Sequence, residues 1–281
     1  MRPTNGECLN SEESIARLPE YEHPPVVETA LAVEFASLPG WNIIHYGLLR
    51  QRFQEAYPNF EVHPAAFIPF PPTVAVDTVP LTIDIANPPI RCFFISEDGT
   101  QLVQIRNGAL AHNWRKQPEN DIYPRYDTIR PAFVDDLRIF YRFLQDNGFS
   151  APEVWKCEVT YVNHFLRGRE WSDIPSLLEV LPAIRLLDRS QLLTRLTQMQ
   201  FTFNYELPED IGNLRIQLLP FLGPDGKELA QLTLTAFGRP RSNDPQALIE
   251  WIDAGREAVV RGFSEFTSED AQTKTWRRIW P

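Results

Sequence analysis

Apolar and polar residues follow two rhythms along the 281-residue chain, a short one typical of strands and a longer one typical of helices. The short rhythm, in β-branched and aromatic runs, predicts strands at 26–36, 90–96, 101–107, 109–116, 153–166, 196–207, 213–222 and 229–238. The turn "EDGT" between the second and third of these runs contains the Asp-Gly pair that favours a β-hairpin. The proline-rich stretch from 58 to 90 predicts irregular extended pieces, with edge strands around 73–86.

The longer rhythm predicts helices at 41–58, 130–148, 172–181 and 244–266. Gly148 is expected to end the second helix, and Ser172 is expected to cap the third. The apolar residues expected to face the core are Trp41, Ile44, Leu48 and Phe53 in the first helix, Phe133, Leu137, Phe140 and Leu144 in the second, and Leu248, Trp251 or Ile252, Val259 and Phe263 in the last.

The predicted elements occur twice in the same order, β-α-β-β-β-α. The first copy covers residues 26–150 and the second covers 151–281, and both follow a loosely held tail at 1–25. Because residue identity between the copies is slight, the order of elements alone indicates an internal duplication. Two such copies can share one mainly antiparallel sheet with long helices on one face, as TATA-binding-protein-like and helix-grip folds do. The predicted fold class is therefore α+β, and this likeness of architecture carries no function with it.

Net charge and cysteine content limit the environment and the partners. A formal charge of −10 and a pI of about 5.1 oppose binding to phosphate backbones, so we expect no nucleic-acid partner. The N-terminal stretch is acid-rich and no apolar run is long enough to span a bilayer, so we expect neither a secretory signal nor a membrane partner. Cys92 and Cys157 have apolar neighbours and form no C-x-x-C motif with Cys8, which is typical of free thiols in a cytoplasmic protein.

The sequence lacks the common catalytic and nucleotide-binding motifs, namely the P-loop, the G-x-G-x-x-G turn, the G-x-S-x-G elbow and H-E-x-x-H. The five histidines have no metal-ligand spacing, so we expect neither a metal nor another cofactor. Catalytic groups can still converge from distant positions. The pattern nevertheless favours a protein without enzymatic activity.

The densest group of candidate binding residues lies in "RNGALAHNWRKQPENDIYPRYD", residues 106–127. Strand alternation places Trp114 on the same face as Leu110, which favours core packing. Arg115 falls on the opposite face, where the strand leaves the sheet and meets solvent. Both residues are candidate members of a binding site.

The loop that follows carries Tyr123, Arg125 and Tyr126 beside prolines, a composition that suits a binding edge. The alternative is a proline-braced entry into the next helix, which Asp127 or Thr128 would cap. Both interpretations remain open from the sequence alone.

A second group of candidates lies in "CEVTYVNHF", where Tyr161 and Asn163 alternate onto the apolar face of a strand. Asn204 in "FTFNY" is a second asparagine among the aromatic residues of a predicted strand, and it is a candidate for the same reason. Buried asparagines of this kind either hold neighbouring loops or line a polar pocket, and the structural role is the more common one.

Five stretches in order resemble a sporadically distributed, functionally uncharacterised family of bacterial proteins: "PPVVETALAVEF", "GTQLVQIRNGALAHNWRK", "YPRYDTIRPAF", "CEVTYVNHF" and "FTSEDAQTKTW". That family opens with P-P-[IV]-V-E, continues with N-W-R, and has C-E-[LV]-x-Y-[IV]-N in mid-chain. The similarity runs from Pro24 to Trp276, and His112 stands where the family more often has an aromatic residue. The resemblance implies one full-length domain, a bacterial origin and a cytoplasmic setting, and it assigns no catalytic residue.

Two functions from different classes fit these observations. The first is a non-enzymatic binding or regulatory module, which engages a protein or peptide in an accessory system such as defence or toxin control. The second is an enzyme or small-ligand protein with a cleft between helices and sheet, lined by Trp114, Tyr161, Asn163 and Asn204. The sequence favours the first function and leaves open whether the protein forms a homodimer.

Overall fold

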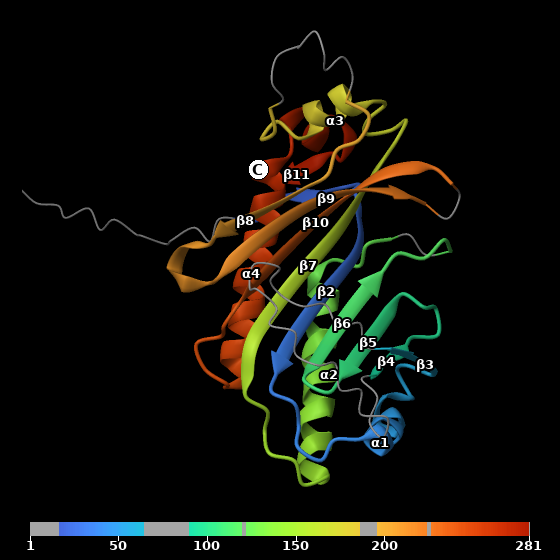
Figure 1. Ribbon diagram of the computed structural model, residues 1–281, viewed down its shortest axis with the longest axis vertical. Coiled ribbons are helices and arrows are strands. Elements are labelled where there is room, and N and C mark those ends of the chain that lie inside the picture. Colours follow the sequence, from blue (N-terminus) through green and yellow to red (C-terminus); the bar gives the residue numbers. More distant parts are fainter. Residues whose placement is uncertain (1–16, 65–89, 120–121, 186–195, 224–225, 281) are drawn as a thin grey trace, which may run out of the picture.

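The computed structural model describes residues 17–64, 90–119, 122–185, 196–223 and 226–280. Its centre is a nine-stranded antiparallel sheet with the spatial order β3-β4-β5-β6-β2-β7-β10-β9-β8 (Figure 1). The strands are β2 (Val26–Phe35), β3 (Asn59–Pro64), β4 (Ile90–Ile95), β5 (Gln101–Arg106), β6 (Ala109–Arg115), β7 (Val154–Leu166), β8 (Phe201–Glu206), β9 (Asn213–Leu222) and β10 (Glu228–Gly238).

Two long helices, α2 (Tyr126–Asp146) and α4 (Pro245–Phe266), lie side by side on one face of this sheet (Figure 1). Smaller elements surround them: α1 (Ile43–Phe53), α3 (Ile174–Val180), a 3₁₀ turn at Pro208–Asp210 and a π-helical turn at Ala271–Thr275. A separate two-stranded ribbon joins β1 (Glu20–Tyr21) to β11 (Arg278–Trp280). The chain is therefore α+β with an antiparallel sheet, as the sequence predicts.

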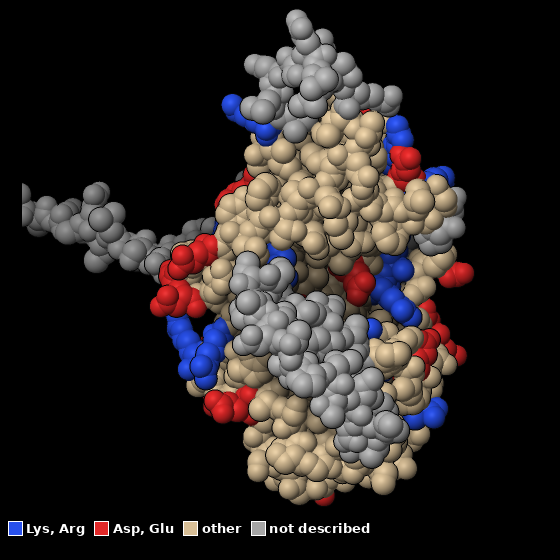
Figure 2. Space-filling view, viewed as in Figure 1, with Lys and Arg blue, Asp and Glu red and all other residues tan. Residues whose placement is uncertain are grey.

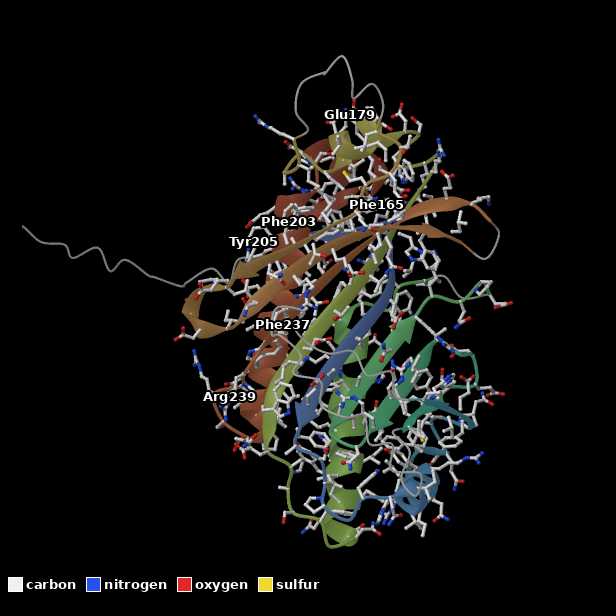
Figure 3. All side chains as sticks on the ribbon, viewed as in Figure 1. Phe165, Glu179, Phe203, Tyr205, Phe237 and Arg239 are labelled. Carbon is white, nitrogen blue, oxygen red and sulfur yellow. The ribbon has the colours of Figure 1, made fainter. Side chains whose placement is uncertain are left out.

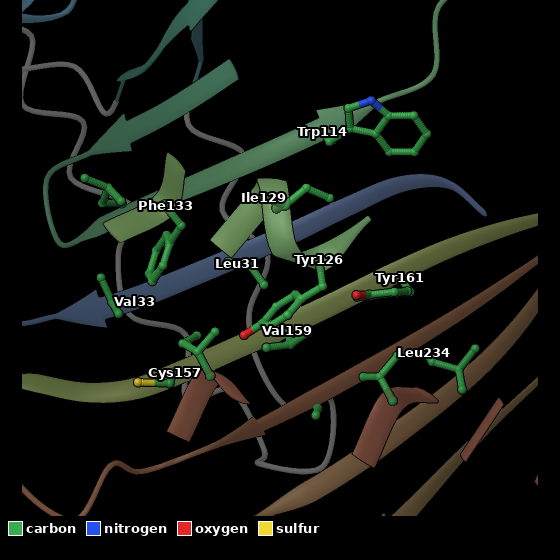
Figure 4. Close-up of a cluster of buried hydrophobic side chains, with 14 of the residues drawn as sticks. Leu31, Val33, Trp114, Tyr126, Ile129, Phe133, Cys157, Val159, Tyr161 and Leu234 are labelled. Atoms are coloured by element: carbon green, nitrogen blue, oxygen red, sulfur yellow. The ribbon is translucent and has the colours of Figure 1, made fainter. Parts of the chain in front are cut away.

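The core lies between the long helices and the sheet, because alternate residues of each central strand are apolar. In β7, Cys157, Val159 and Phe165 face the helices and are fully buried. In α2 and α4 the predicted core stripes are buried at every position. Figure 4 shows Tyr126 of α2, Tyr161 of β7 and Leu234 of β10 in this layer.

The first helix region buries only part of the predicted face: Trp41 and Phe53 are buried as expected, but Ile44 and Leu48 are not. Ile44 is 66% exposed and Leu48 is 38% exposed, whereas Tyr46, Leu49 and Phe53 face the core. The helix begins at Ile43, so Trp41 precedes it and packs from the connecting loop. The predicted stripe counted Trp41 into the helical repeat and was therefore displaced around the helix axis.

Three boundary predictions were also wrong. Helix α2 begins at Tyr126 rather than at residue 130, with Pro131 inside it. Its N-cap is Arg125 rather than Asp127 or Thr128, and Arg125 provides no side-chain cap. Tyr126 and Ile129 are buried, so core packing stabilises a first turn whose sequence lacks a capping residue. Asp173, not Ser172, caps α3 by accepting a hydrogen bond from the Ser176 amide at 3.0 Å.

The described end of the predicted tail, residues 17–25, is held in place rather than loose. Tyr21 is 6% exposed and sits in the β1–β11 ribbon. Strand β3 was not predicted, because the prolines that follow it obscured its alternation. The edge strands expected around 73–86 lie outside the described residues.

Candidate binding site

A pocket opens between α4, the first turn of α2, the sheet and the segment around β1. Its empty volume is about 680 Å³, including space open to solvent. The walls consist of Pro19, Glu20, Tyr21, Pro24, Pro25, Val26, Tyr123, Arg125, Tyr126, Asp127, Tyr161, Asn163, Leu234, Arg256, Val259, Val260 and Phe263. We call this site the Tyr/Arg pocket.

Three tyrosines from three elements line its inner wall. The Tyr123 hydroxyl donates a hydrogen bond to the Tyr161 hydroxyl at 3.2 Å. The Tyr126 hydroxyl donates a hydrogen bond to Asp253 Oδ1 at 2.6 Å. Arg130 donates two hydrogen bonds to the same carboxylate. This shared carboxylate joins α2 to α4 beside the pocket.

Burial raises the pKa of all three tyrosines. For Tyr123 the neighbouring Tyr161 raises the pKa further, and for Tyr126 the hydrogen bond to Asp253 does the same. The pKa of Tyr161 is raised by burial, and its contacts with Tyr123 and Arg256 oppose the rise. These hydroxyls therefore remain protonated at neutral pH and serve as hydrogen-bonding groups rather than as bases.

Two guanidinium groups stand over the tyrosine rings. The Arg125 guanidinium carbon lies 5.6 Å from the centroid of Tyr123, and Arg256 lies 4.9 Å from that of Tyr126. Arg125 donates one hydrogen bond, to the Tyr21 carbonyl at 2.7 Å. Arg125 also has φ 69° and ψ 164°, a backbone conformation that is costly for a residue with a side chain.

The outer wall is the segment around β1, which is fixed at both ends. The Tyr21 hydroxyl and Ser264 Oγ are 2.6 Å apart, and the Tyr21 ring meets Phe263 edge-on at 5.7 Å. Backbone amides of Glu22 and His23 donate to carbonyls near the C-terminal end, each at 3.0 Å. The pocket thus has a rigid wall built from both ends of the described chain.

The Tyr/Arg pocket brings together five of the residues that the sequence singled out: Tyr123, Arg125, Tyr126, Tyr161 and Asn163. Asn163 is 4% exposed and donates to the Leu232 carbonyl at 3.2 Å. Trp114 is buried directly behind the pocket, with its ring centroid 5.2 Å from that of Tyr123. Trp114 therefore supports the site without lining it.

Arg115 and Asn204 do not belong to this site. Arg115 donates to the Gly99 carbonyl at 3.0 Å and closes the turn between β4 and β5. Asn204 is exposed on edge strand β8, where its Oδ1 accepts a hydrogen bond from Arg215 at 3.2 Å. It lies on the sheet face opposite to Asn163, because Phe203 and Tyr205 occupy the helix side of β8.

Sequence reasoning missed Tyr21 and Arg256. Tyr21 lay in the predicted tail, and no local pattern ties it to α4. Arg256, however, occurs in the apolar stripe formed by Ile252, Val259 and Phe263, where a charged residue is unusual. This charged residue within an apolar stripe is the sequence feature that could have identified Arg256 as a candidate site residue.

A second polar cluster was also missed, and it lies in the core rather than in a pocket. His112 Nδ1 is 2.6 Å from Asp136 Oδ2, and the Tyr57 hydroxyl donates to both oxygens of that carboxylate. Burial raises the pKa of Asp136, and the hydrogen bond with His112 opposes the rise. His112 is 0% exposed and neither residue lines the Tyr/Arg pocket, so the arrangement joins β6 to α2 as a structural contact.

Within the described parts of the chain, no three His, Cys, Asp or Glu side chains are grouped as metal ligands would be. None of the described helices is long and apolar enough to cross a membrane. No protein-family model matches the sequence, and no curated protein shows significant similarity to it. What the Tyr/Arg pocket can bind therefore has to follow from its own lining.

Proposed function

We propose that the protein is a non-enzymatic binding module and that the Tyr/Arg pocket holds a segment of a protein or peptide partner. The observation that carries this proposal is the convergence of four tyrosines, including Tyr21 of the outer wall, and two arginines around one open cavity. Tyrosine and arginine contribute disproportionately to binding energy because each combines a large contact area with hydrogen-bonding groups. The tyrosines are already held by neighbouring side chains, so their side chains would lose little conformational freedom on binding.

The shape of the hollow supports an extended occupant. A second hollow, whose empty volume of about 550 Å³ includes space open to solvent, shares Glu20, Asp127 and Arg256 with the Tyr/Arg pocket. Its other lining residues are Arg17 and Leu18. A ligand seated in the pocket can therefore continue past Arg256 over the surface. A peptide uses such a continuation, whereas a compact metabolite does not.

The second candidate is an enzyme or small-ligand protein with a cleft between helices and sheet. One observation favours it: Tyr161 and Asn163 line a pocket in that position, as this alternative expects. Against catalysis, the raised pKa values of the pocket tyrosines leave no hydroxyl there poised as a base. The pocket tyrosines therefore fit this alternative better as hydrogen-bonding groups for a small molecule than as catalytic bases.

A selection from a random peptide library against the whole protein tests the proposal. Selected peptides are then titrated against Val260→Trp, which fills the pocket from α4, and against Glu257→Trp, which adds the same ring on the exposed side of that helix. We expect Val260→Trp to weaken binding by at least about tenfold and Glu257→Trp to leave it unchanged. Circular dichroism on both variants establishes that they fold.

Equal affinity for the wild-type protein and Val260→Trp contradicts the proposal, because the peptide then binds elsewhere. A library that yields no binder also contradicts it. If Val260→Trp does not fold, Val260→Phe takes its place, since it adds less volume at the same point.

We also propose that the chain is an internal duplication with the TATA-binding-protein-like or helix-grip-like arrangement. In support, the spatial order outward from the centre is β2-β6-β5-β4 on one side and β7-β10-β9-β8 on the other. Each series uses its strands in the same chain sequence and ends in a long helix. Superposition of residues 26–150 on 151–281 tests this, and a mismatch in strand order contradicts it.

We further propose a homodimer formed through β8. This edge strand carries Phe203, 39% exposed, and Tyr205, 46% exposed, and it has neither a lysine nor a proline to prevent pairing (Figure 3). Two antiparallel copies would extend the sheet across a twofold axis. Sedimentation measurements that find only monomer at high concentration contradict this.

The setting we propose is the bacterial cytoplasm, in an accessory system such as defence or toxin control. The buried free thiols of Cys92 and Cys157 support a reducing compartment. The accessory role and the bacterial origin depend on the five-stretch resemblance alone. Fractionation of native host cells, followed by immunoblotting, would determine whether the protein is in the cytoplasm.

A further inference from the structure

Arg125 and Arg256 line the Tyr/Arg pocket, and within the described parts of the chain neither pairs with a carboxylate. Among the described residues, no Asp or Glu oxygen lies within 4.0 Å of either guanidinium group, although most other arginines of the two long helices pair with one. The Nε–H of Arg256 is buried and has no hydrogen-bond partner. A guanidinium group that is partly withdrawn from water and has no negatively charged partner is costly, and a bound anion reduces that cost.

The first turn of α2 contributes backbone N–H groups near the same wall, while Asp127 in this turn carries a negative charge. Arg125 is the N-cap of this helix and no side chain caps the turn. The start of a helix carries partial positive charge and unsatisfied backbone N–H groups. Arg125 also has a strained backbone, with φ 69°. Strained residues of this kind cluster at ligand-binding sites.

The acidic residues at the rim limit the charge of the anion that the pocket can bind. Glu20 and Asp127 are exposed at the mouth of the pocket and repel a doubly charged group such as phosphate. A single carboxylate is repelled less, and its two oxygens match the fork of an arginine side chain. The pocket therefore favours a monocarboxylate over a phosphate.

The remaining wall is apolar. Leu234, Val259, Val260 and Phe263 form it, together with the rings of Pro24 and Pro25. A ligand that places its carboxylate at the arginines presents its next few carbon atoms to these side chains. Burial of that apolar part is worth about 25 cal/mol for each square ångström removed from water.

From these features we infer that the Tyr/Arg pocket recognises the free C-terminal carboxylate of a peptide whose last residue is apolar or aromatic. This inference rests on the proposed function and names the part of the partner that enters the site. The carboxylate lies between Arg125 and Arg256, the last side chain packs against Leu234 and Phe263, and the preceding residues leave over the second hollow.

Calorimetric titration with N-acetyl-leucyl-phenylalanine, as the free acid and as the C-terminal amide, tests the inference. We expect the acid to bind at least about tenfold tighter than the amide. Arg256→Gln is expected to bring the two affinities together, and Arg138→Gln, an exposed arginine of α2, to leave the difference intact. Comparison with 4-phenylbutyrate separates the peptide source from a free aromatic acid, since only the dipeptide can reach the second hollow.

Each outcome is decisive. Equal binding of acid and amide to the wild-type protein, or no binding of the acid, overturns carboxylate recognition. If both probes bind equally and Val260→Trp abolishes both, the pocket remains a binding site and only the carboxylate claim fails. If Val260→Trp leaves the binding of both probes unchanged, the proposed function itself fails. Tighter binding of 4-phenylbutyrate than of the dipeptide overturns the peptide source.

Discussion

At the scale of single residues, the strand register of β7 decides which face of the sheet holds the pocket. Alternation in "CEVTYVNHF" predicted that Tyr161 and Asn163 face the core, and the structure confirms it. Asn204 was wrongly grouped with Asn163, because alternation along β8 places it on the face opposite Phe203 and Tyr205. Alternation assigns a residue to a face, but it does not say whether another element covers that face.

Asn163→Ala is expected to lower stability by roughly 1–3 kcal/mol, because it leaves the Leu232 carbonyl without its side-chain donor and opens space beneath α4. His164→Ala, on the opposite face, is expected to change stability little at a pH above the ordinary histidine value of 6.5. Thermal unfolding of the two variants side by side provides the measurement. The reverse ranking would mean that the register of β7 is inverted.

His164 is also expected to make the folding stability depend on pH. Burial lowers its pKa, the nearby charge of Lys116 acts in the same direction, and the hydrogen bond with Gln231 opposes both. The unfolded chain therefore binds a proton more readily between the folded pKa and 6.5, so stability falls as pH decreases through that window. Unfolding curves of His164→Gln should show a weaker loss over this range. An identical slope in both proteins would exclude His164 as the cause.

At the scale of elements, the sequence predicts the eight main strands and the long helices well, because each has a clear periodic pattern. It predicts helix starts less well. The first turn of α2 has no capping residue and is formed because Tyr126 and Ile129 pack into the core. The role of β1 could not be predicted, because Tyr21 is placed by contacts with residues more than two hundred positions away.

The N-cap of α2 gives a prediction about stored strain. Arg125→Gly and Arg125→Ala both remove the guanidinium group and its bond to Tyr21, but only glycine adopts φ 69° and ψ 164° without cost. The glycine variant is therefore expected to be more stable than the alanine variant by roughly 1–3 kcal/mol. Chemical denaturation of both measures this difference. Equal stability would show that the backbone at Arg125 is unstrained.

At the scale of the whole molecule, charge is spread rather than concentrated. On the face opposite the long helices, basic and acidic side chains are interspersed around the rim (Figure 2). Lys156 lies 3.1 Å from oxygens of both Glu34 and Glu158, and Arg106 lies 3.3 Å from Glu34. Lys156 and Arg106 are therefore neutralised within the protein.

This distribution, with the net charge of −10, leads us to expect no specific DNA binding at physiological salt. A gel-shift assay at about 0.15 M salt should show no retained complex with duplex DNA. A complex with sub-micromolar affinity would contradict the expectation and would move attention from the pocket to the sheet face.

The central claim is that the Tyr/Arg pocket is where this protein binds its partner. The most direct measurement is a crystal structure of the protein with N-acetyl-leucyl-phenylalanine, or with the tightest peptide from the library. We expect density in the pocket, with a carboxylate between Arg125 and Arg256 and an apolar side chain against Leu234 and Phe263. Density for the peptide along β8 or on the opposite sheet face, with the pocket unoccupied, would contradict it.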